Sequence, residues 1–118
     1  MPKMDVRKRR ERFRKRIRFT ANRPRLSVHK SNKYIYAQLI DLRTGNVLAS
    51  YDSYRLVKDN KDMAKKKGVE KAYEVGLRLG KEILKKKINK IVFDRSGYKY
   101  HGQVKALAEG LRKAGLEF

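Results

Sequence analysis

Apolar and polar residues alternate in the stretches at residues 26–29 and 34–41, and a further run of strand-forming residues begins at Val47. An alternation of period two is typical of β-strands with one buried face. The segments between these stretches are polar, and Gly45 suits the positive φ that a tight turn requires. The pattern therefore predicts three strands in an antiparallel meander, beginning at Arg25.

Helical spacing replaces this alternation in the second half of the chain. Apolar or small residues mark one helix face over residues 69–86 and another over residues 104–114, which Gly115 closes as a left-handed cap. The β-branched run at residues 88–93 is typical of a strand buried on both faces of a sheet, and its approach through a helix implies parallel pairing. Residues 53–66 are polar and Lys-rich without a clear period, so we expect a loop there that grades into the next helix.

These elements predict one α/β domain, residues 23–118, in which a mixed sheet packs against two helices. The order is arm-β-β-β-α-β-α, and the sheet is the antiparallel meander plus one parallel strand. Residues 1–22 form a basic arm with too few apolar residues for a core-facing stripe, so we expect it to be disordered, or helical once phosphates neutralise it.

Gly76 and Gly80 each cost a helix about 1 kcal/mol relative to Ala. Close helix-on-sheet packing is the favoured reason for them, and a nearby phosphate backbone is the alternative.

The charge of the chain is strongly positive. Its 33 Lys and Arg against 12 Asp and Glu give a net charge of +21, and residues 1–25 carry 12 of the basic residues but only two acidic ones. Such a surplus exceeds what solubility needs and requires a polyanion nearby. Nine of the fourteen residues from 5 to 18 are Lys or Arg. Arginine pairs bidentately with phosphate, whereas a merely solvated helix would mix charges at i, i+4 spacing.

Several other classes of protein do not fit this composition. The absence of Cys excludes disulfides and thiolate metal sites, and two His without a carboxylate cluster make a metal or other cofactor unexpected. No stretch approaches the roughly 20 apolar residues of a membrane span, and the N-terminus lacks the apolar core of a signal peptide. An organellar transit peptide would be richer in Ser, of which there is none before Ser27. We therefore expect a cytoplasmic protein that does not contact a membrane.

RNA is a better candidate than DNA for the polyanion. A basic region that lies in a DNA groove needs a dimerising heptad zipper, and none follows the arm. An arm that orders on contact can instead thread between packed RNA helices. Tyr34 and Tyr36 share one strand face, where the rings either stack on unpaired bases and riboses or pack in a core, and the sequence leaves both interpretations open.

The segment from Phe93 to Val104 combines potential chemistry with a helix start. Asp94, Ser96 and His101 admit a hydrolytic interpretation, but they lie on one loop and the nucleophile-elbow pattern is absent. A phosphate site is the better interpretation, because a helix N-terminus offers free N–H groups beside basic side chains. The groups concerned are the backbone amides of Gly102 and Gln103 and the side chains of Arg95, Lys99 and Lys105.

Two long motifs carry a resemblance to a known family. RPRLSVHKSNKYIYAQLID from Arg23 and VFDRSGYKYHGQVKALAEGLRKAGLEF to the C-terminus resemble the bacterial-type large-subunit ribosomal protein eighteen, whereas residues 51–67 look unlike that family. The resemblance implies an α/β domain with a basic arm that binds 5S rRNA and links it to 23S rRNA in the central protuberance, beside large-subunit ribosomal protein five. It implies no catalysis, and we expect a monomer when the protein is free.

The resemblance also implies which residues face RNA. Gln103, Ser96 and His29 stand where the family more commonly has Arg, Gly and Phe, which puts one phosphate contact in doubt at Gln103. Together with the basic and aromatic residues chosen from the sequence, the expected RNA-binding residues are Arg7, Lys8, Arg9, Arg10, Arg12, Arg14, Lys15, Arg16, Arg18, Arg23, Arg25, Lys30, Ser31, Asn32, Lys33, Tyr34, Tyr36, Arg95, Ser96, Gly97, Tyr98, Lys99, Tyr100, His101, Gly102, Gln103 and Lys105.

The predicted function is a non-catalytic RNA scaffold of the large ribosomal subunit. The folded domain would choose its RNA site by shape, while the arm and the loop neutralise phosphates. A basic-arm regulator that binds DNA is the first alternative, and a small enzyme built on the loop at residues 94–102 is the second.

Overall fold

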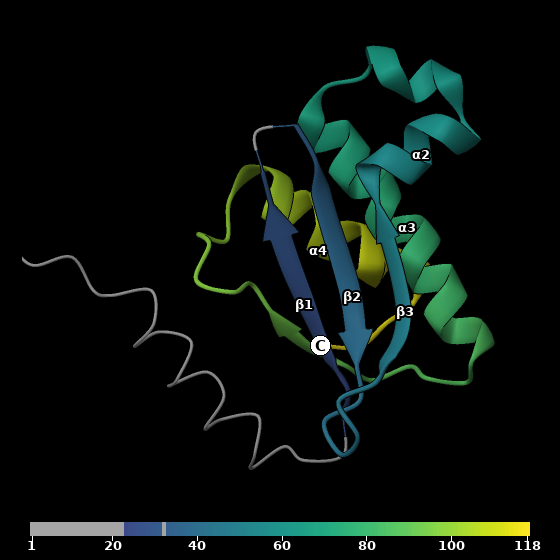
Figure 1. Ribbon diagram of the computed structural model, residues 1–118, viewed down its shortest axis with the longest axis vertical. Helices are drawn as coiled ribbons and strands as arrows, with labels where there is room; N and C mark the ends of the chain where they lie inside the picture. Colours follow the sequence, from purple (N-terminus) through teal and green to yellow (C-terminus); the bar gives the residue numbers. More distant parts are fainter. Residues whose placement is uncertain (1–22, 32) are drawn as a thin grey trace, which may run out of the picture.

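The computed structural model describes residues 23–31 and 33–118, and its centre is a four-stranded sheet (Figure 1). The strands are β1 (Arg25–Lys30), β2 (Ile35–Ile40), β3 (Val47–Asp52) and β4 (Val92–Asp94), in the spatial order β3-β2-β1-β4. β1, β2 and β3 pair antiparallel, and β4 pairs parallel with β1. The predicted meander with one added parallel strand is confirmed.

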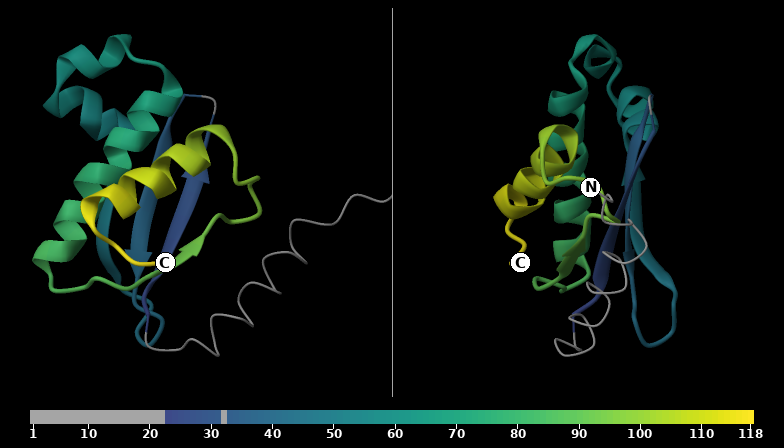
Figure 2. Two further views of the ribbon diagram at one scale, coloured as in Figure 1. Left: turned by 180° about the vertical axis from the view of Figure 1, so that it is seen from behind. Right: turned by 90° about the vertical axis from the view of Figure 1, so that its left-hand side faces the viewer.

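Two long helices, α3 (Gly68–Lys85) and α4 (Gly102–Ala114), cover one face of the sheet and leave the other open (Figure 2). The alternation along the strands explains this arrangement, because every second side chain points at the helices. The strand residues that do so are fully buried or nearly so: Leu26, Val28, Ile35, Ala37, Leu39, Ala49 and Tyr51. None of the helices in the described part of the chain is long and apolar enough to cross a membrane.

The stretch at residues 53–66 is helical, so the predicted loop is wrong. It contains α2 (Ser53–Asp59) and the short 3₁₀ helix η1 (Lys61–Lys65). Asp52 caps α2 by accepting a hydrogen bond from the backbone N–H of Arg55 at 2.7 Å, and Leu56 is fully buried. A seven-residue helix with so few buried positions shows no repeating apolar period, which is why the pattern missed it.

The fourth strand is also shorter and more exposed than expected. It covers Val92–Asp94 at an edge of the sheet rather than the whole run at residues 88–93. The preceding residues pair instead with the C-terminal tail, since the backbone N–H of Ile91 donates to the carbonyl of Glu117 at 3.1 Å. Val92 and Phe93 are therefore half-buried, and the expectation of a strand covered on both faces is wrong.

Close packing explains the helix glycines, but the partner is a helix and not the sheet. A Cβ added to Gly76 would lie 2.2 Å from the carbonyl oxygen of Leu107, and one added to Gly110 would lie 2.2 Å from that of Tyr73. α3 and α4 therefore touch backbone to backbone. At the end of α4, Gly115 has a φ of 124°, as its position as a cap predicts.

Candidate nucleic-acid interface

Parallel pairing of β1 and β4 brings the two predicted RNA-binding segments to the same end of the sheet. Ser27 of β1 pairs with Asp94 of β4, and the two strands run parallel, so the chain leaves both strands at the same end of the sheet. The β1–β2 turn follows β1, and the loop at residues 95–101 follows β4 and leads to α4 (Figure 1). Residues some 65 positions apart in the sequence thus become neighbours.

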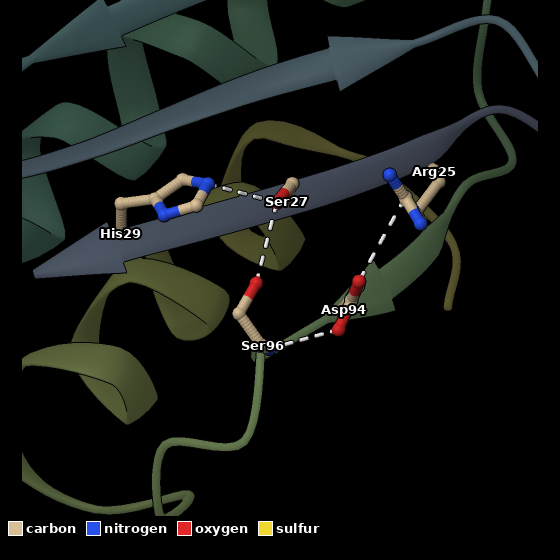
Figure 3. A network of polar contacts seen from close by, with 5 residues as sticks. All are labelled: Arg25, Ser27, His29, Asp94 and Ser96. Atoms are coloured by element: carbon tan, nitrogen blue, oxygen red, sulfur yellow. Dashed lines mark hydrogen bonds and ion pairs between the residues drawn. The ribbon is translucent and has the colours of Figure 1, made fainter. Parts of the chain in front are cut away.

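A polar network on the open face of the sheet fixes the start of this loop (Figure 3). The Arg25 Nε lies 3.7 Å from Oδ2 of the buried Asp94, whose Oδ1 accepts the backbone N–H of Ser96 at 2.8 Å. Ser96 Oγ is 3.3 Å from Ser27 Oγ, which in turn is 3.3 Å from Nε2 of His29. Because Ser96 has a φ of 53° and is buried, these contacts hold the chain in a conformation that a non-glycine residue rarely adopts.

Tyr98 then ties the loop to the end of β1. Its hydroxyl donates to the carbonyl of Lys30 at 3.1 Å and accepts from the backbone N–H of the same residue at 3.4 Å. Arg95 and Lys99, on either side of Tyr98, are exposed, as is Lys30. The loop that carries Arg95 and Lys99 is therefore held beside Lys30, at the start of the β1–β2 turn.

Tyr34 and Tyr36 point away from the core, so core packing is excluded and stacking on RNA stays a prediction. They retain 46% and 38% of their exposure, respectively. Tyr36 stacks on His29 with the ring centroids 4.9 Å apart and the planes 14° from parallel. The two tyrosines are thus available to a partner.

The helix start has a mixed set of groups. His101 is the N-cap residue of α4 but its side chain makes no capping hydrogen bond. The side chain of Gln103 lies against α3, since its Nε2 would be 2.3 Å from a Cβ on Gly68. Lys105 is exposed, and its Nζ lies 4.0 Å from Oε1 of Glu109. Such an exposed ion pair is weak, so Lys105 can still bind an anion.

The structure separates two of the predicted residues from the others. The Tyr100 hydroxyl accepts from Arg112 Nη1 at 3.2 Å, and its ring stands edge-on to Phe93, so it belongs to the helix side of the sheet. Arg23 precedes the opposite end of β1, a six-residue strand whose two ends are about 17 Å apart. The predicted residues outside the described part of the chain are Arg7, Lys8, Arg9, Arg10, Arg12, Arg14, Lys15, Arg16, Arg18 and Asn32.

One neighbouring group was missed by the sequence reasoning. Tyr54 of α2 contacts Tyr34 edge to face at 5.7 Å, and Lys58 lies 5.5 Å from the centre of the Tyr54 ring. The only signal in the sequence was Asp52 as an N-cap before a segment with one buried apolar residue, which is too weak to place these side chains.

The electrostatics of this end of the sheet favour an anion. Residues 30–36 and 95–105, at this end, contain five Lys or Arg and no Asp or Glu. Asp94, between these segments, is already engaged by Arg25 and by the backbone of Ser96. The described residues include no group of three or more His, Cys, Asp or Glu that could hold a metal ion. Fold and surface together define a small α/β protein that binds a polyanion.

Comparison with known proteins assigns the chain to a family. Residues 2–118 match the family described as ribosomal L18 of archaea, bacteria, mitochondria and chloroplast. The chain is 53% identical over 111 residues to the large ribosomal subunit protein uL18 of Thermotoga petrophila, covering 94% of this chain and 90% of the relative. It is 50% identical over 112 residues to the uL18 of Geobacter metallireducens, with the same coverage. The chain belongs to the ribosomal L18 family, and the resemblance seen in its two motifs is confirmed.

Proposed function

We propose that this protein binds 5S rRNA and helps to attach it to 23S rRNA in the central protuberance of the large ribosomal subunit, beside ribosomal protein five. Family membership supplies the coarser statement, that the chain is a structural constituent of the large ribosomal subunit that binds rRNA. Ribosomal proteins are generally structural rather than enzymatic, so we assign the loop at residues 94–102 to binding. The place of action would be the ribosome in the cytoplasm.

The observation that carries the proposal is the joining of two cationic segments at one end of the sheet. The Tyr98 hydroxyl contacts the backbone of Lys30, and the Ser96 hydroxyl contacts Ser27, so the loop cannot swing away from β1 without breaking these bonds. Held cations bind phosphate more tightly than mobile ones, because less conformational freedom is lost on contact. Lys30, Lys33, Arg95 and Lys99 are the side chains we assign to phosphates.

The aromatic residues support RNA over DNA. Unpaired bases and riboses are accessible in RNA loops, where they stack on aromatic rings, whereas bases in duplex DNA are already stacked on each other. Tyr36 is held by its stack on His29 and faces the open side of the sheet. We assign Tyr34 and Tyr36 to such contacts, and the backbone amides of Gly102 and Gln103 to a phosphate.

Salt-dependent binding to purified 5S rRNA tests the proposal. If about six to ten phosphates are neutralised, raising the salt from 50 to 200 mM weakens binding roughly a thousandfold or more. The full chain should bind 5S rRNA more tightly than duplex DNA of equal length. A flat salt response, or a preference for the DNA, would contradict the proposal.

Variants distinguish the folded surface from the arm. Replacing both Arg95 and Lys99 with Gln should lower the affinity and the salt slope. The same replacement of Lys85 and Lys86, at the far end of α3, serves as the matched control for lost charge (Figure 1). Deleting residues 1–20 should weaken RNA binding and leave the fold intact, and unfolding on deletion would mean that the arm belongs to the core.

A further inference from the structure

Two exposed tyrosines from distant segments meet beside the β1–β2 turn. Tyr34 immediately precedes β2, and Tyr54 is the second residue of α2. Their ring centroids are 5.7 Å apart and their planes are 88° apart, while their side chains remain 46% and 52% exposed. In an edge-to-face pair, the ring that supplies its edge keeps both faces clear of the other ring. One ring of the pair therefore keeps its faces clear of the other ring, and both residues are exposed to solvent.

Backbone contacts hold the two rings in this relation. The Ser53 hydroxyl accepts the backbone N–H of Ile35 at 3.1 Å, which joins the start of α2 to the start of β2. The residues on either side of that bond are Tyr54 and Tyr34. The turn is fixed as well, because Ser31 Oγ accepts the backbone N–H of Tyr34 at 3.1 Å. A partner that stacks on these rings would lose little freedom of the protein on binding.

A cation accompanies the aromatic pair. Lys58 lies one helical turn after Tyr54, and its Nζ is 5.5 Å from the centre of that ring. The two nearest carboxylates in the sequence of α2 and its cap have other partners, since Asp52 accepts from the backbone of Arg55 and Asp59 accepts from the Tyr51 hydroxyl at 2.7 Å. The ammonium group lies over one face of the Tyr54 ring, so a base would stack on the other face. A flat ring beside a cation suits a nucleotide, which combines a flat base with a phosphate.

We propose that Tyr54 and Lys58, together with Tyr34, form a stacking site on α2 for one unpaired nucleobase of 5S rRNA, with Lys58 beside the phosphate of that nucleotide. The inference rests on the proposed function, because it extends the same RNA surface from the β1–β2 turn onto α2. Continuity supports it: Ser31 N donates to the carbonyl of Tyr34 at 2.8 Å across the turn that begins after Lys30. The site enlarges the interface beyond the segments chosen from the sequence.

Binding of the full chain to purified 5S rRNA tests the site through two substitutions with different signatures. Tyr54→Leu removes the ring and should weaken binding roughly 5- to 150-fold, the contribution of one base–aromatic stack, while the salt slope stays the same. Lys58→Gln should also weaken binding but should reduce the salt slope by roughly 0.7, the value for one phosphate of a single strand. Tyr54→Phe retains the ring and should bind as the unchanged chain does.

The controls separate this inference from the proposed function. Lys85→Gln removes an exposed charge from the far end of α3. It should not reduce the salt slope in the way expected for Lys58→Gln. Circular dichroism of each variant checks that the fold is retained, as expected for substitutions at exposed positions. Ultraviolet crosslinking of the complex should join Tyr54 to a nucleotide.

If the unchanged chain binds 5S rRNA and Tyr54→Leu binds equally well, the stacking site is wrong and the proposed function stands. A loss with Tyr54→Phe equal to that with Tyr54→Leu would also overturn the site, since it would implicate the hydroxyl and not the ring. Failure of the unchanged chain to bind 5S rRNA would overturn the proposed function and the stacking site with it.

Discussion

The contact between α3 and α4 predicts that one added methyl group at Gly76 destabilises the protein. A Cβ at this position would lie 2.2 Å from the carbonyl oxygen of Leu107, 3.0 Å from the backbone N of Leu111 and 3.1 Å from the Cα of Gly110. All three neighbours are backbone atoms of α4, so no side chain can rotate out of the way. Gly76→Ala must therefore push the two helices apart.

The size of the effect follows from two opposing contributions. Alanine is a better helix former than glycine, which favours the variant by about 1 kcal/mol. Overpacking costs about 1–3 kcal/mol, and a rigid backbone neighbour puts this case at about 3 kcal/mol. The net loss is then about 2 kcal/mol in the free energy of unfolding, or roughly 8–16 °C in Tm for a domain of this size.

Gly68→Ala is the matched comparison on the same helix. A Cβ there would also be too close to an atom, at 2.3 Å, but that atom is Nε2 at the end of the flexible Gln103 side chain. Gln103 can move at little cost, so the variant should be as stable as the unchanged protein or more stable by up to about 1 kcal/mol. The same substitution in one helix thus has effects of opposite sign.

Urea denaturation followed by circular dichroism measures both variants. Gly76→Ala should lower the midpoint while the m-value stays constant, because the surface exposed on unfolding does not change. A Gly76→Ala protein at least as stable as the unchanged one would refute the reasoning, as would an equal loss in Gly68→Ala. Either result would mean that the separation of α3 and α4 is not set by these backbone contacts.

Two further predictions concern tyrosine hydroxyls. Burial first, and then a hydrogen bond donated to Asp59, raise the pKa of Tyr51 above its ordinary value of 10.0, so the fold favours the neutral phenol. This contribution to stability is present below pH 10 and is lost as the pH rises through the pKa of the folded state. The urea midpoint of the unchanged chain should therefore fall between about pH 8 and 11, and Tyr51→Phe should make that fall less steep. An equally steep fall in Tyr51→Phe would refute this prediction. Tyr98→Phe removes both bonds to Lys30, should cost about 0.5–1.5 kcal/mol, and should speed amide hydrogen exchange in residues 95–101; exchange as slow as in the unchanged chain would count against the tethering of the loop.

The strands and long helices could be predicted because each carries its own periodic pattern. β3 begins where expected, and α3 differs from the prediction by one residue at each end. α2 could not be predicted, since its stability comes from an N-cap on Asp52 and from burying Leu56 among residues distant in the sequence. The short length of β4 could not be predicted for a similar reason. The residues before it pair with the C-terminal tail, which is distant in the sequence, rather than with β1.

The candidate interface was predicted only as separate pieces. Basic composition and the motifs at residues 23–41 and 92–118 predicted which segments face RNA. They could not indicate that the Tyr98 hydroxyl reaches Lys30, that Tyr100 faces Arg112, or that Tyr54 joins Tyr34. Each of these contacts depends on the position of one element relative to another.

The sequence by itself determined the type of the four strands and the two long helices, the alternation that buries one sheet face, and the charge that demands a polyanion, because these depend on neighbouring residues or on simple counts. Only the tertiary structure decided which face of the sheet stays open and which side chains meet there. Parallel pairing of β1 with β4 brings Lys30, at the end of β1, together with the loop at residues 95–101. Such proximity arises when strands far apart in the chain pair, and no local pattern records it.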